Sequence, residues 1–336
     1  MSARESIIPV FVPHLGCPND CVFCNQRRIS GQQKCADADS VRQAVDTANR
    51  ILPKGARRQL AFYGGSFTAI DVSVQTALLS AAKEYLDRGD ISSIRLSTRP
   101  DAIDDAVLDR LEAFGVETVE IGAQSLDDGV LLLSGRGHTA EDVERASRLI
   151  KARGFKLILQ MMTGLPGDTK EKCTETAKRI IALSPDGVRI YPTVIVRDTA
   201  LFDLWQYGHY REHTVEDAVD WCAEIVPLFD AAGIPVIRLG LNPTDELSGG
   251  AAAGGAYHPA LGELVKSRIM LKKAQTLLGG IEENSAVEIV VGRGKTSQML
   301  GQKRCNYESL VRDFRLKSLR VCEREEKDDR IEIRIV

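Results

Sequence analysis

The sequence Cys17-Pro18-Asn19-Asp20-Cys21-Val22-Phe23-Cys24 places three thiols close together, with the spacing C-x3-C-x2-C. A helix would spread these sulfurs over its surface, whereas a loop that contains Pro, Asn and Asp can turn all three toward one centre. Thiolates are ligands of zinc, copper(I) and iron–sulfur clusters. A structural zinc site normally has four ligands in two separated pairs. Three cysteines without a paired partner therefore indicate a centre with one metal position open.

The composition of the 336-residue chain is that of an ordinary globular protein, with 43% hydrophobic and 27% charged residues. A net charge of −3 gives no overall attraction to nucleic acid or to acidic membranes. We see no run of about 18 apolar residues and no secretory leader, so we expect a cytoplasmic protein that does not enter a membrane. In a reducing compartment, eight cysteines are not expected to form a disulfide framework.

Short apolar segments alternate with helical patterns over the first two thirds of the chain. The segments are rich in Val, Ile and Leu, as expected for strands that are buried on both faces. Six or seven strand–helix units predict an α/β fold, and they favour a partial TIM-type parallel barrel over a five-stranded doubly wound sheet. The predicted strands are 7–12, 59–63, 91–97, 118–122, 156–162, 187–191 and 234–239, and the predicted helices are 40–51, 72–86, 104–114, 140–151, 170–183 and 215–232.

The pattern changes after residue 245. Residues 248–256 are all Ser, Gly or Ala, which predicts a loop or linker, or alternatively a lid over the site. A helical pattern and three short strand patterns follow. We therefore expect a barrel over residues 1–245, a Gly/Ala-rich loop over 246–258 and a small α+β extension over 259–336.

Unusual residues occur where the predicted strands end. In parallel α/β folds the reactive side chains lie at the carboxyl ends of the strands, so we expect these loops to converge on one site. Gly64-Gly65 lets the backbone approach a ligand closely, because no Cβ intervenes. Arg99 can pair with a carboxylate through two hydrogen bonds, or form a surface salt bridge. Gln124 and Gln160 can each donate and accept, which suits an adenosine or amino-acid moiety.

Together these motifs resemble those of the radical SAM superfamily. The resemblance covers roughly residues 7–240 and is carried by the three cysteines and by Gly64-Gly65 on the second loop. Further motifs are similar to the catalytic subunit of Elongator, which modifies the wobble uridine of tRNA, and to oxygen-independent coproporphyrinogen III oxidase. These motifs are Phe62-Tyr-Gly-Gly-Ser-Phe-Thr68, Arg99-Pro-Asp101, Gly122-Ala-Gln-Ser125, Arg136-Gly-His138 and Gly164-Leu-Pro-Gly167, whereas Arg189-Ile-Tyr-Pro192 is nearer to Elongator.

The resemblance implies a [4Fe–4S] cluster held by Cys17, Cys21 and Cys24, with S-adenosylmethionine (SAM) chelating the fourth iron. An electron donor of flavodoxin or ferredoxin type would reduce the cluster, and SAM would then be cleaved to methionine and a 5′-deoxyadenosyl radical. The resemblance also implies that Phe23 packs beside the cluster. Gly64, Gly65 and Ser66 would meet the methionine amine, and Ser97, Arg99, Gln124 and Gln160 would line the ribose and carboxylate.

The tail has a local surplus of basic residues. Between Val287 and Val321, eight Lys and Arg residues occur with three acidic ones. This composition suits contacts with phosphates, or alternatively a solvated charged face balanced by the acidic residues of 323–329. Lys303 and Arg304 are the candidate RNA contacts. We expect no acetyl transfer of the kind that Elongator carries out, because the sequence after residue 280 is too short for its acetyltransferase domain.

Three interpretations follow from the sequence. The first is a radical SAM enzyme that acts on RNA, with a tRNA base as its substrate. The second is the same chemistry on a small molecule such as a porphyrinogen. The third is a non-catalytic protein in which the cysteines form a structural metal site, with Cys35 or His14 as the fourth ligand. The sequence makes no prediction of the oligomeric state.

Overall fold

The computed structural model describes residues 6–12, 17, 21–25, 36–53 and 56–336. Two compact units make up the chain. The first consists of residues 1–214 and 228–257, and the second of residues 215–227 and 258–336. His14 and Cys35, the alternative fourth ligands, lie outside the described residues.

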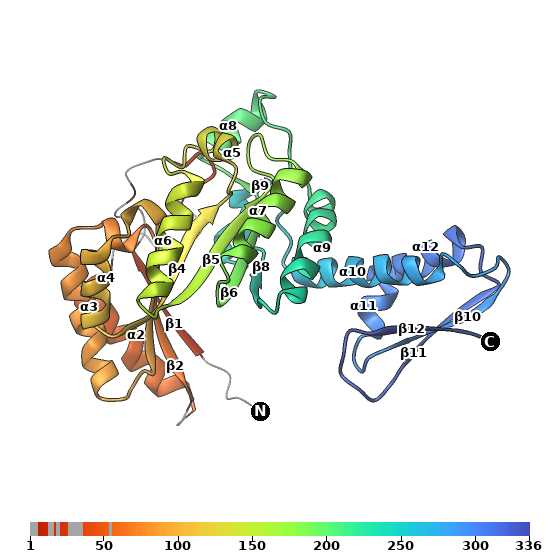
Figure 1. The fold of residues 1–336 in the computed structure, drawn as a ribbon, viewed down its shortest axis with the longest axis horizontal. Coiled ribbons are helices and arrows are strands. Elements are labelled where there is room, and N and C mark those ends of the chain that lie inside the picture. Colours follow the sequence, from red (N-terminus) through yellow and green to blue (C-terminus); the bar gives the residue numbers. More distant parts are fainter. Residues whose placement is uncertain (1–5, 13–16, 18–20, 26–35, 54–55) are drawn as a thin grey trace. The chain divides into compact units, whose positions relative to one another are not determined.

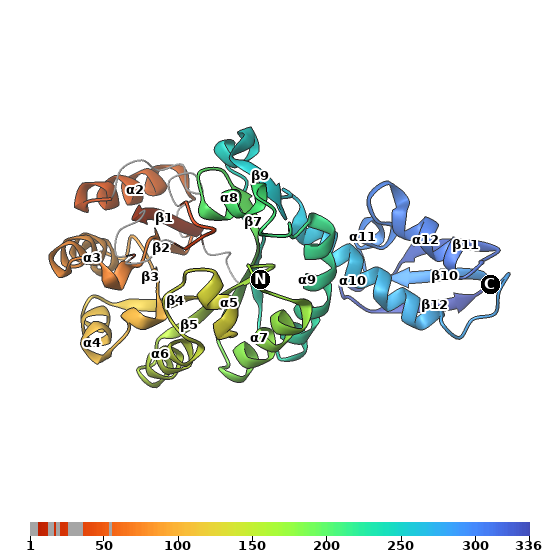
Figure 2. The same cartoon turned by 90° about the horizontal axis from the view of Figure 1, so that it is seen from above.

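The first unit is built on a seven-stranded sheet whose neighbouring strands are all parallel. The strand order is β1-β2-β3-β4-β5-β6-β8, so each helical connection leads to the next strand along the sheet. The sheet curls with its helices on the outer side (Figure 2). This arrangement confirms the predicted α/β fold with a partial TIM-type barrel. The strands are Ser6–Val12 (β1), Arg58–Gly64 (β2), Ser93–Thr98 (β3), Val116–Gln124 (β4), Lys156–Thr163 (β5), Gly187–Pro192 (β6) and Val236–Leu239 (β8).

The helices of the first unit begin at residues whose side chains cap them. Asp37 and Ser40 form a reciprocal capping box at the start of α2, and Thr139 and Asp142 form another at the start of α6. The apolar faces of the helices cover the sheet, whose central strand β4 is buried over its last seven residues (Figure 1). The helices are Ala38–Ile51 (α2), Val72–Asp87 (α3), Asp105–Ala113 (α4), Asp128–Leu133 (α5), Ala140–Ala152 (α6), Lys170–Ala182 (α7) and Ala200–Gln206 (α8).

The Gly/Ala-rich segment, for which the sequence predicted a loop over 246–258, contains regular structure. It forms a helical turn, Leu247–Ala251 (η3), and a strand, Ala252–Gly255 (β9), which pairs antiparallel with Val194–Val196 (β7). The small residues permit this pairing rather than preventing it. A Cβ on Gly255, whose φ is +81°, would lie 2.6 Å from the carbonyl oxygen of Thr193.

The second unit has an α+β fold. Its three-stranded sheet has the order β11-β10-β12, with β10 parallel to β11 and antiparallel to β12. Helices α10 and α12 lie along one side of this sheet (Figure 1), and residues from both helices and all three strands pack in one core. The elements are Val215–Ala231 (α9, to residue 227), Leu261–Leu278 (α10), Ala286–Val291 (β10), Thr296–Leu300 (α11), Cys305–Asp313 (α12), Ser318–Glu323 (β11) and Ile331–Ile335 (β12).

Ion pairs join α10 to the first part of α9 within the second unit. Arg268 pairs with Glu216 at 2.6 Å, and Lys272 pairs with Asp220 at 2.8 Å and with Glu224 at 3.1 Å. Among the described residues, no helix combines the length and the apolar character that crossing a membrane requires.

Candidate active site

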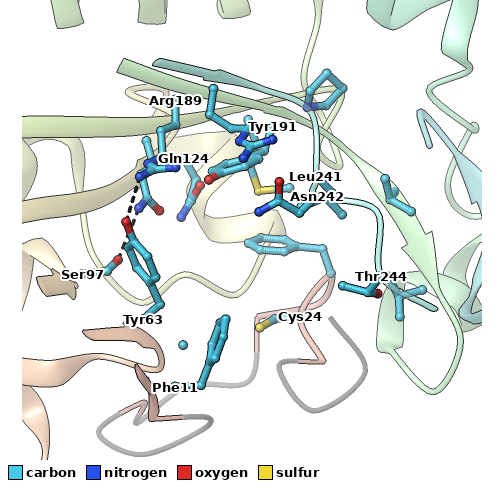
Figure 3. A pocket seen from close by; sticks show the side chains of 18 residues that line it. Phe11, Cys24, Tyr63, Ser97, Gln124, Arg189, Tyr191, Leu241, Asn242 and Thr244 are labelled. Carbon is cyan, nitrogen blue, oxygen red and sulfur yellow. Dashed lines mark hydrogen bonds between the residues drawn. The ribbon is translucent and has the colours of Figure 1, made fainter. Parts of the chain in front are cut away.

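The carboxyl ends of the first five strands surround a cavity of about 110 Å³. All the residues to which the sequence assigned cluster or SAM contacts line it, except Ser66. A larger cavity, of about 300 Å³, shares part of this lining and continues to β6 and β8 (Figure 3). The residues common to both cavities are Phe23, Cys24, Gly64, Ser97, Gln124 and Gln160.

The cysteine loop is held in place by hydrogen bonds from its neighbours. The backbone N–H of Val22 donates to the carbonyl of Ser134, and that of Leu201 donates to the carbonyl of Val22. The N–H of Cys24 donates to the carbonyl of Cys21, which forms a tight turn between two of the thiols. Phe23 packs at the edge of an apolar cluster around Leu201.

Arg136 lies beside the thiols and was not among the site residues that the sequence predicted. Its Nη1 donates to Sγ of Cys21 at 3.1 Å, and its Nη2 donates to the carbonyl of Gly122 at 2.7 Å. A nearby guanidinium stabilises thiolate over thiol, and thiolate is the form that binds metal. Burial and the neighbouring Cys21 raise the pKa of Cys17, against the opposing charges of Arg136 and Arg99. The signal for Arg136 was its place in the Arg136-Gly-His138 motif.

The described residues contain no group of three His, Cys, Asp or Glu side chains that could hold a metal ion. A [4Fe–4S] cluster takes one thiolate per iron, so its ligands need not converge on a single ion. The donor set of three cysteines with an adjacent arginine therefore fits such a cluster.

Ser66 supports the end of β3 and does not line the cavity. Its hydroxyl is buried, lies 2.9 Å from that of Thr98, and accepts a hydrogen bond from the backbone N–H of Arg99 at 3.1 Å. Gly64 and Gly65 do line the cavity. Gly64 has a φ of +107°, and the N–H of Gly65 donates to the carbonyl of Val12, which joins the ends of β1 and β2.

Arg99 and Gln124, which line the cavity, each have a buried polar atom without a hydrogen-bond partner among the described residues. Arg99 donates from Nε and Nη2 to the carboxylate of Asp101, at 2.9 and 3.0 Å, but its Nη1 has no acceptor. The side-chain carbonyl of Gln124 has no donor. Gln124 also has a φ of +64°, at a bulge in the pairing of β4 with β5. Unsatisfied buried groups of this kind are costly, so the arrangement suits a polar ligand that supplies both partners.

A buried carboxylate behind the wall of the larger cavity binds several of the side chains that line it, and sequence reasoning missed it. Glu120 on β4 is fully buried and accepts hydrogen bonds from Arg95 at 2.8 Å, from Arg189 at 2.8 and 2.9 Å, and from Gln160 at 2.8 Å. Burial alone would raise the pKa of Glu120, but the charges of Arg189 and Arg95 outweigh it and hold that pKa below its usual range. The signal was an acidic residue in the middle of the predicted strand 118–122.

Tyr63 extends this network to the wall of the cavity. Its hydroxyl accepts a hydrogen bond from Nη2 of Arg189 at 3.0 Å (Figure 3). It also donates to Glu120 at 3.3 Å. Burial, together with the charge of Glu120, raises the pKa of Tyr63 to about 12. Gln160 donates to the hydroxyl of Ser97 at 3.3 Å, so two predicted SAM contacts are linked to the same network.

Fold and site together define a class of enzymes with an iron–sulfur centre at the mouth of a partial parallel barrel. The model of the family described as "Radical SAM superfamily" matches residues 11–180, and that of "Radical_SAM C-terminal domain" matches residues 185–270. The chain belongs to the radical SAM superfamily. It is a radical SAM enzyme, whose cofactors are a [4Fe–4S] cluster and SAM.

Its curated relatives include proteins that are named for their action on tRNA. The tRNA uridine(34) acetyltransferase of Dehalococcoides mccartyi is 27% identical over 61% of this chain and 52% of its own length. Human Elongator complex protein 3 is 31% identical over 56% of this chain and 35% of its own length. Protein YhcC of Escherichia coli is 29% identical over 62% of this chain and 70% of its own length. The chain thus spans about half of the length of the Dehalococcoides acetyltransferase and about a third of the length of human Elongator complex protein 3.

A solved structure confirms the fold. Elp3 of the archaeon Methanocaldococcus infernus superposes with a TM-score of 0.64 at 22% identity, over 80% of this chain and 63% of that one.

Proposed function

We propose that this enzyme modifies a base of tRNA, with uridine as the first candidate. The observation that carries the proposal is the similarity of the radical SAM core to proteins named as tRNA uridine(34) acetyltransferases and Elongator complex protein 3. The larger cavity is consistent with it, because its lining continues beyond the residues assigned to SAM toward β6 and β8, where a substrate would lie beside the cofactor.

Cys17, Cys21 and Cys24 would hold the cluster, and Arg136 would donate a hydrogen bond to Sγ of Cys21. Arg99 and Gln124, whose buried Nη1 and Oε1 lack partners among the described residues, would bind polar groups of SAM. When bound, the two cofactors supply one-electron chemistry that removes a hydrogen atom from the substrate. A reductant of flavodoxin or ferredoxin type would deliver the electron.

The chain itself excludes water and fixes charge around the reacting groups. Phe11, Phe23, Met162 and Val194 form apolar parts of the wall. The depressed pKa of Glu120 keeps it ionised at neutral pH, so that its hydrogen bonds to Gln160 and the arginines are permanent. A rigid polar network of this kind positions side chains without reorganising during the reaction.

The second unit offers cations for RNA phosphates. Of its eight basic residues between Val287 and Val321, half pair with carboxylates: Lys295, Arg312, Arg315 and Arg320. The others, Arg293, Lys303, Arg304 and Lys317, form no ion pair within the described chain. Lys303 and Arg304 are both exposed and have φ values of +50° and +63°, and Arg304 lies 4.2 Å from the ring centroid of Tyr307. Strained backbone is often retained at functional sites, so we propose that this pair contacts phosphates.

Anaerobic reconstitution tests the cofactor assignment. We expect about four irons and four sulfides per chain, and the loss of both when Cys17, Cys21 and Cys24 are changed to Ala. Cys305→Ala, which alters an exposed thiol of the second unit, is the matched control and should retain the cluster. One zinc per chain without sulfide would instead support the structural metal site.

Comparison of modified nucleosides tests the substrate. tRNA from cells that lack the gene should be missing one modification, and this tRNA should stimulate formation of 5′-deoxyadenosine by the reconstituted enzyme. Identical nucleoside profiles would refute the proposal and direct attention to small-molecule substrates.

The salt dependence of tRNA binding tests the basic pair separately. Changing Lys303 and Arg304 to Ala should weaken binding and reduce the slope of log K against log salt by about 1 for each lost phosphate contact. Arg312→Ala with Arg315→Ala removes the same charge from residues that already have carboxylate partners, so it should change the slope less. Equal slopes for the two double variants would contradict a specific role for Lys303 and Arg304.

A further inference from the structure

The far wall of the larger cavity carries positive charge that the structure does not balance. Two arginines, Arg189 and Arg238, line this cavity, and no Asp or Glu is found among its described lining residues. The nearest carboxylate in the network, Glu120, is fully buried behind the wall and already accepts hydrogen bonds from both Arg95 and Arg189.

Arg189 and Arg238 occupy paired positions on neighbouring parallel strands. They are partners in the register of β6 and β8, so both side chains project from the same face of the sheet. Their environments differ, because Arg189 is neutralised by Glu120 and Arg238 is not. Arg238 is half-buried, and it forms no hydrogen bond or ion pair with any residue that the structure describes.

The segment after β8 places further polar groups at the same wall. Asn242 and Thr244 line the cavity along with Arg238 and Tyr191. Figure 3 shows both Asn242 and Tyr191 among the side chains that line this cavity. The hydroxyl of Thr244 accepts a hydrogen bond from the backbone N–H of Leu247 at 3.2 Å, which leaves its own hydrogen available to a ligand.

Arg238 serves a different part of the site from Arg99. Arg99 lines the small cavity beside the three cysteines and is absent from the lining of the large one, whereas the reverse holds for Arg238. We expect Arg99 to bind the methionine carboxylate of SAM, so that carboxylate would not account for the charge of Arg238.

We propose that Arg238, supported by Asn242, binds an oxyanion of the substrate, and that this oxyanion is a phosphate adjacent to the base in the cavity. The choice of phosphate rests on the proposed action on tRNA. A guanidinium matches a phosphate with two parallel hydrogen bonds, and a half-buried cation without a carboxylate partner gains most from such a ligand. The subsite thereby selects a nucleotide over a free nucleoside and sets the position of the base relative to SAM.

The binding of uridine 5′-monophosphate and of uridine to the reconstituted, SAM-loaded full chain tests this subsite by calorimetry. The wild-type enzyme should bind the nucleotide about tenfold more tightly than the nucleoside, as expected for hydrogen bonds between charged groups. Arg238→Gln should abolish that ratio, and Arg238→Lys should keep part of it. Arg148→Gln is the matched control. Arg148 lies on the exposed face of α6, 3.9 Å from Glu144, so its replacement removes one positive charge away from the cavity and should leave the ratio unchanged.

Each contrary result overturns the assignment. Equal affinity of the wild-type enzyme for the two probes, or binding of neither, shows that no phosphate subsite exists. A loss of SAM affinity in Arg238→Gln would place the arginine in the cofactor site. The failure of the proposed function can be told apart from the failure of this subsite. Unchanged nucleosides in tRNA together with a preserved tenfold ratio would refute the substrate and leave the oxyanion subsite standing.

Discussion

Replacing Glu120 by Gln should strongly destabilise the first unit. The variant keeps the shape of the side chain and removes the counter-charge of Arg95 and Arg189, whose side chains are 12% and 11% exposed. In the wild type, Oε1 of Glu120 accepts hydrogen bonds from Arg95, Arg189 and Tyr63, and Oε2 accepts from Arg189 and Gln160. Whichever of these two positions the NH2 group of Gln occupies in the variant, it therefore faces at least two hydrogen-bond donors and no acceptor. Removing one partner of a buried ionic cluster costs about 3–5 kcal/mol, so we expect a loss of that size.

Urea unfolding of the cofactor-free chain under reducing conditions measures the loss. The chain has two tryptophans, Trp205 in the first unit and Trp221 in the second. In a Trp221→Phe background, fluorescence reports the unit that contains Glu120. The free energy of unfolding is then compared between the variants in this background.

Glu117→Gln is the matched control. Glu117 lies on the same strand and pairs with Lys156 at the surface, where its side chain is 37% exposed, so this change should cost less than about 1 kcal/mol. Adding Arg189→Met to Glu120→Gln should restore part of the stability, because it removes a charge that has lost its partner. If Glu120→Gln costs no more than Glu117→Gln, the interpretation of Glu120 as the centre of the network is wrong.

Three further outcomes are expected. Gly164→Ala should destabilise the first unit by at least about 3 kcal/mol, measured by urea unfolding, because the new Cβ would lie 2.1 Å from the ring of His213. Gly89→Ala is the control: Gly89 has a similar positive φ but no atom within 4 Å of the new Cβ, so this change should cost only about 1 kcal/mol. Gly122→Ala should weaken SAM binding in calorimetry, since its Cβ would lie 2.9 Å from Nε2 of Gln124; an unchanged affinity would remove Gln124 from the site. Burial and the charge of Arg136 lower the pKa of His138 to about 4, below its unfolded value, so as the pH falls from 6.5 toward 4 the wild type should lose up to about 3 kcal/mol of stability relative to His138→Gln. Parallel pH profiles of the two proteins would contradict this.

Much of the site could be predicted because it is encoded locally. The spacing of Cys17, Cys21 and Cys24 lies within one loop, and Gly64-Gly65 directly follows an apolar strand. Since the ends of parallel strands meet at one edge, the alternation of strands and helices was enough to bring these loops together. The cofactor contacts assigned to individual residues, Ser66 included, remain predictions. The hydroxyl of Ser66 bonds to Thr98 and to the backbone of Arg99, which adjacency in the motif did not predict.

Other features could not be predicted because they depend on partners far apart in the chain. Glu120 and Arg189 are separated by 69 residues and meet only through the register of β4, β5 and β6. The pairing of β7 with β9 requires the two backbones to approach closely. Small residues allow such an approach, but they occur equally in loops and therefore did not predict a strand. Likewise, the basic composition of the tail did not show which cations would find carboxylates and which would not.

The sequence by itself indicated the class of the enzyme through its resemblance to the radical SAM superfamily, because the cysteine loop and the motifs at the strand ends are short-range patterns that can be recognised without the tertiary structure. Only the tertiary structure decided how charge is distributed inside the barrel. Whether a buried arginine is neutralised or left for a ligand depends on the strand register, and that register places Glu120 against Arg189 and leaves Arg238 facing the cavity without a carboxylate among its described lining residues.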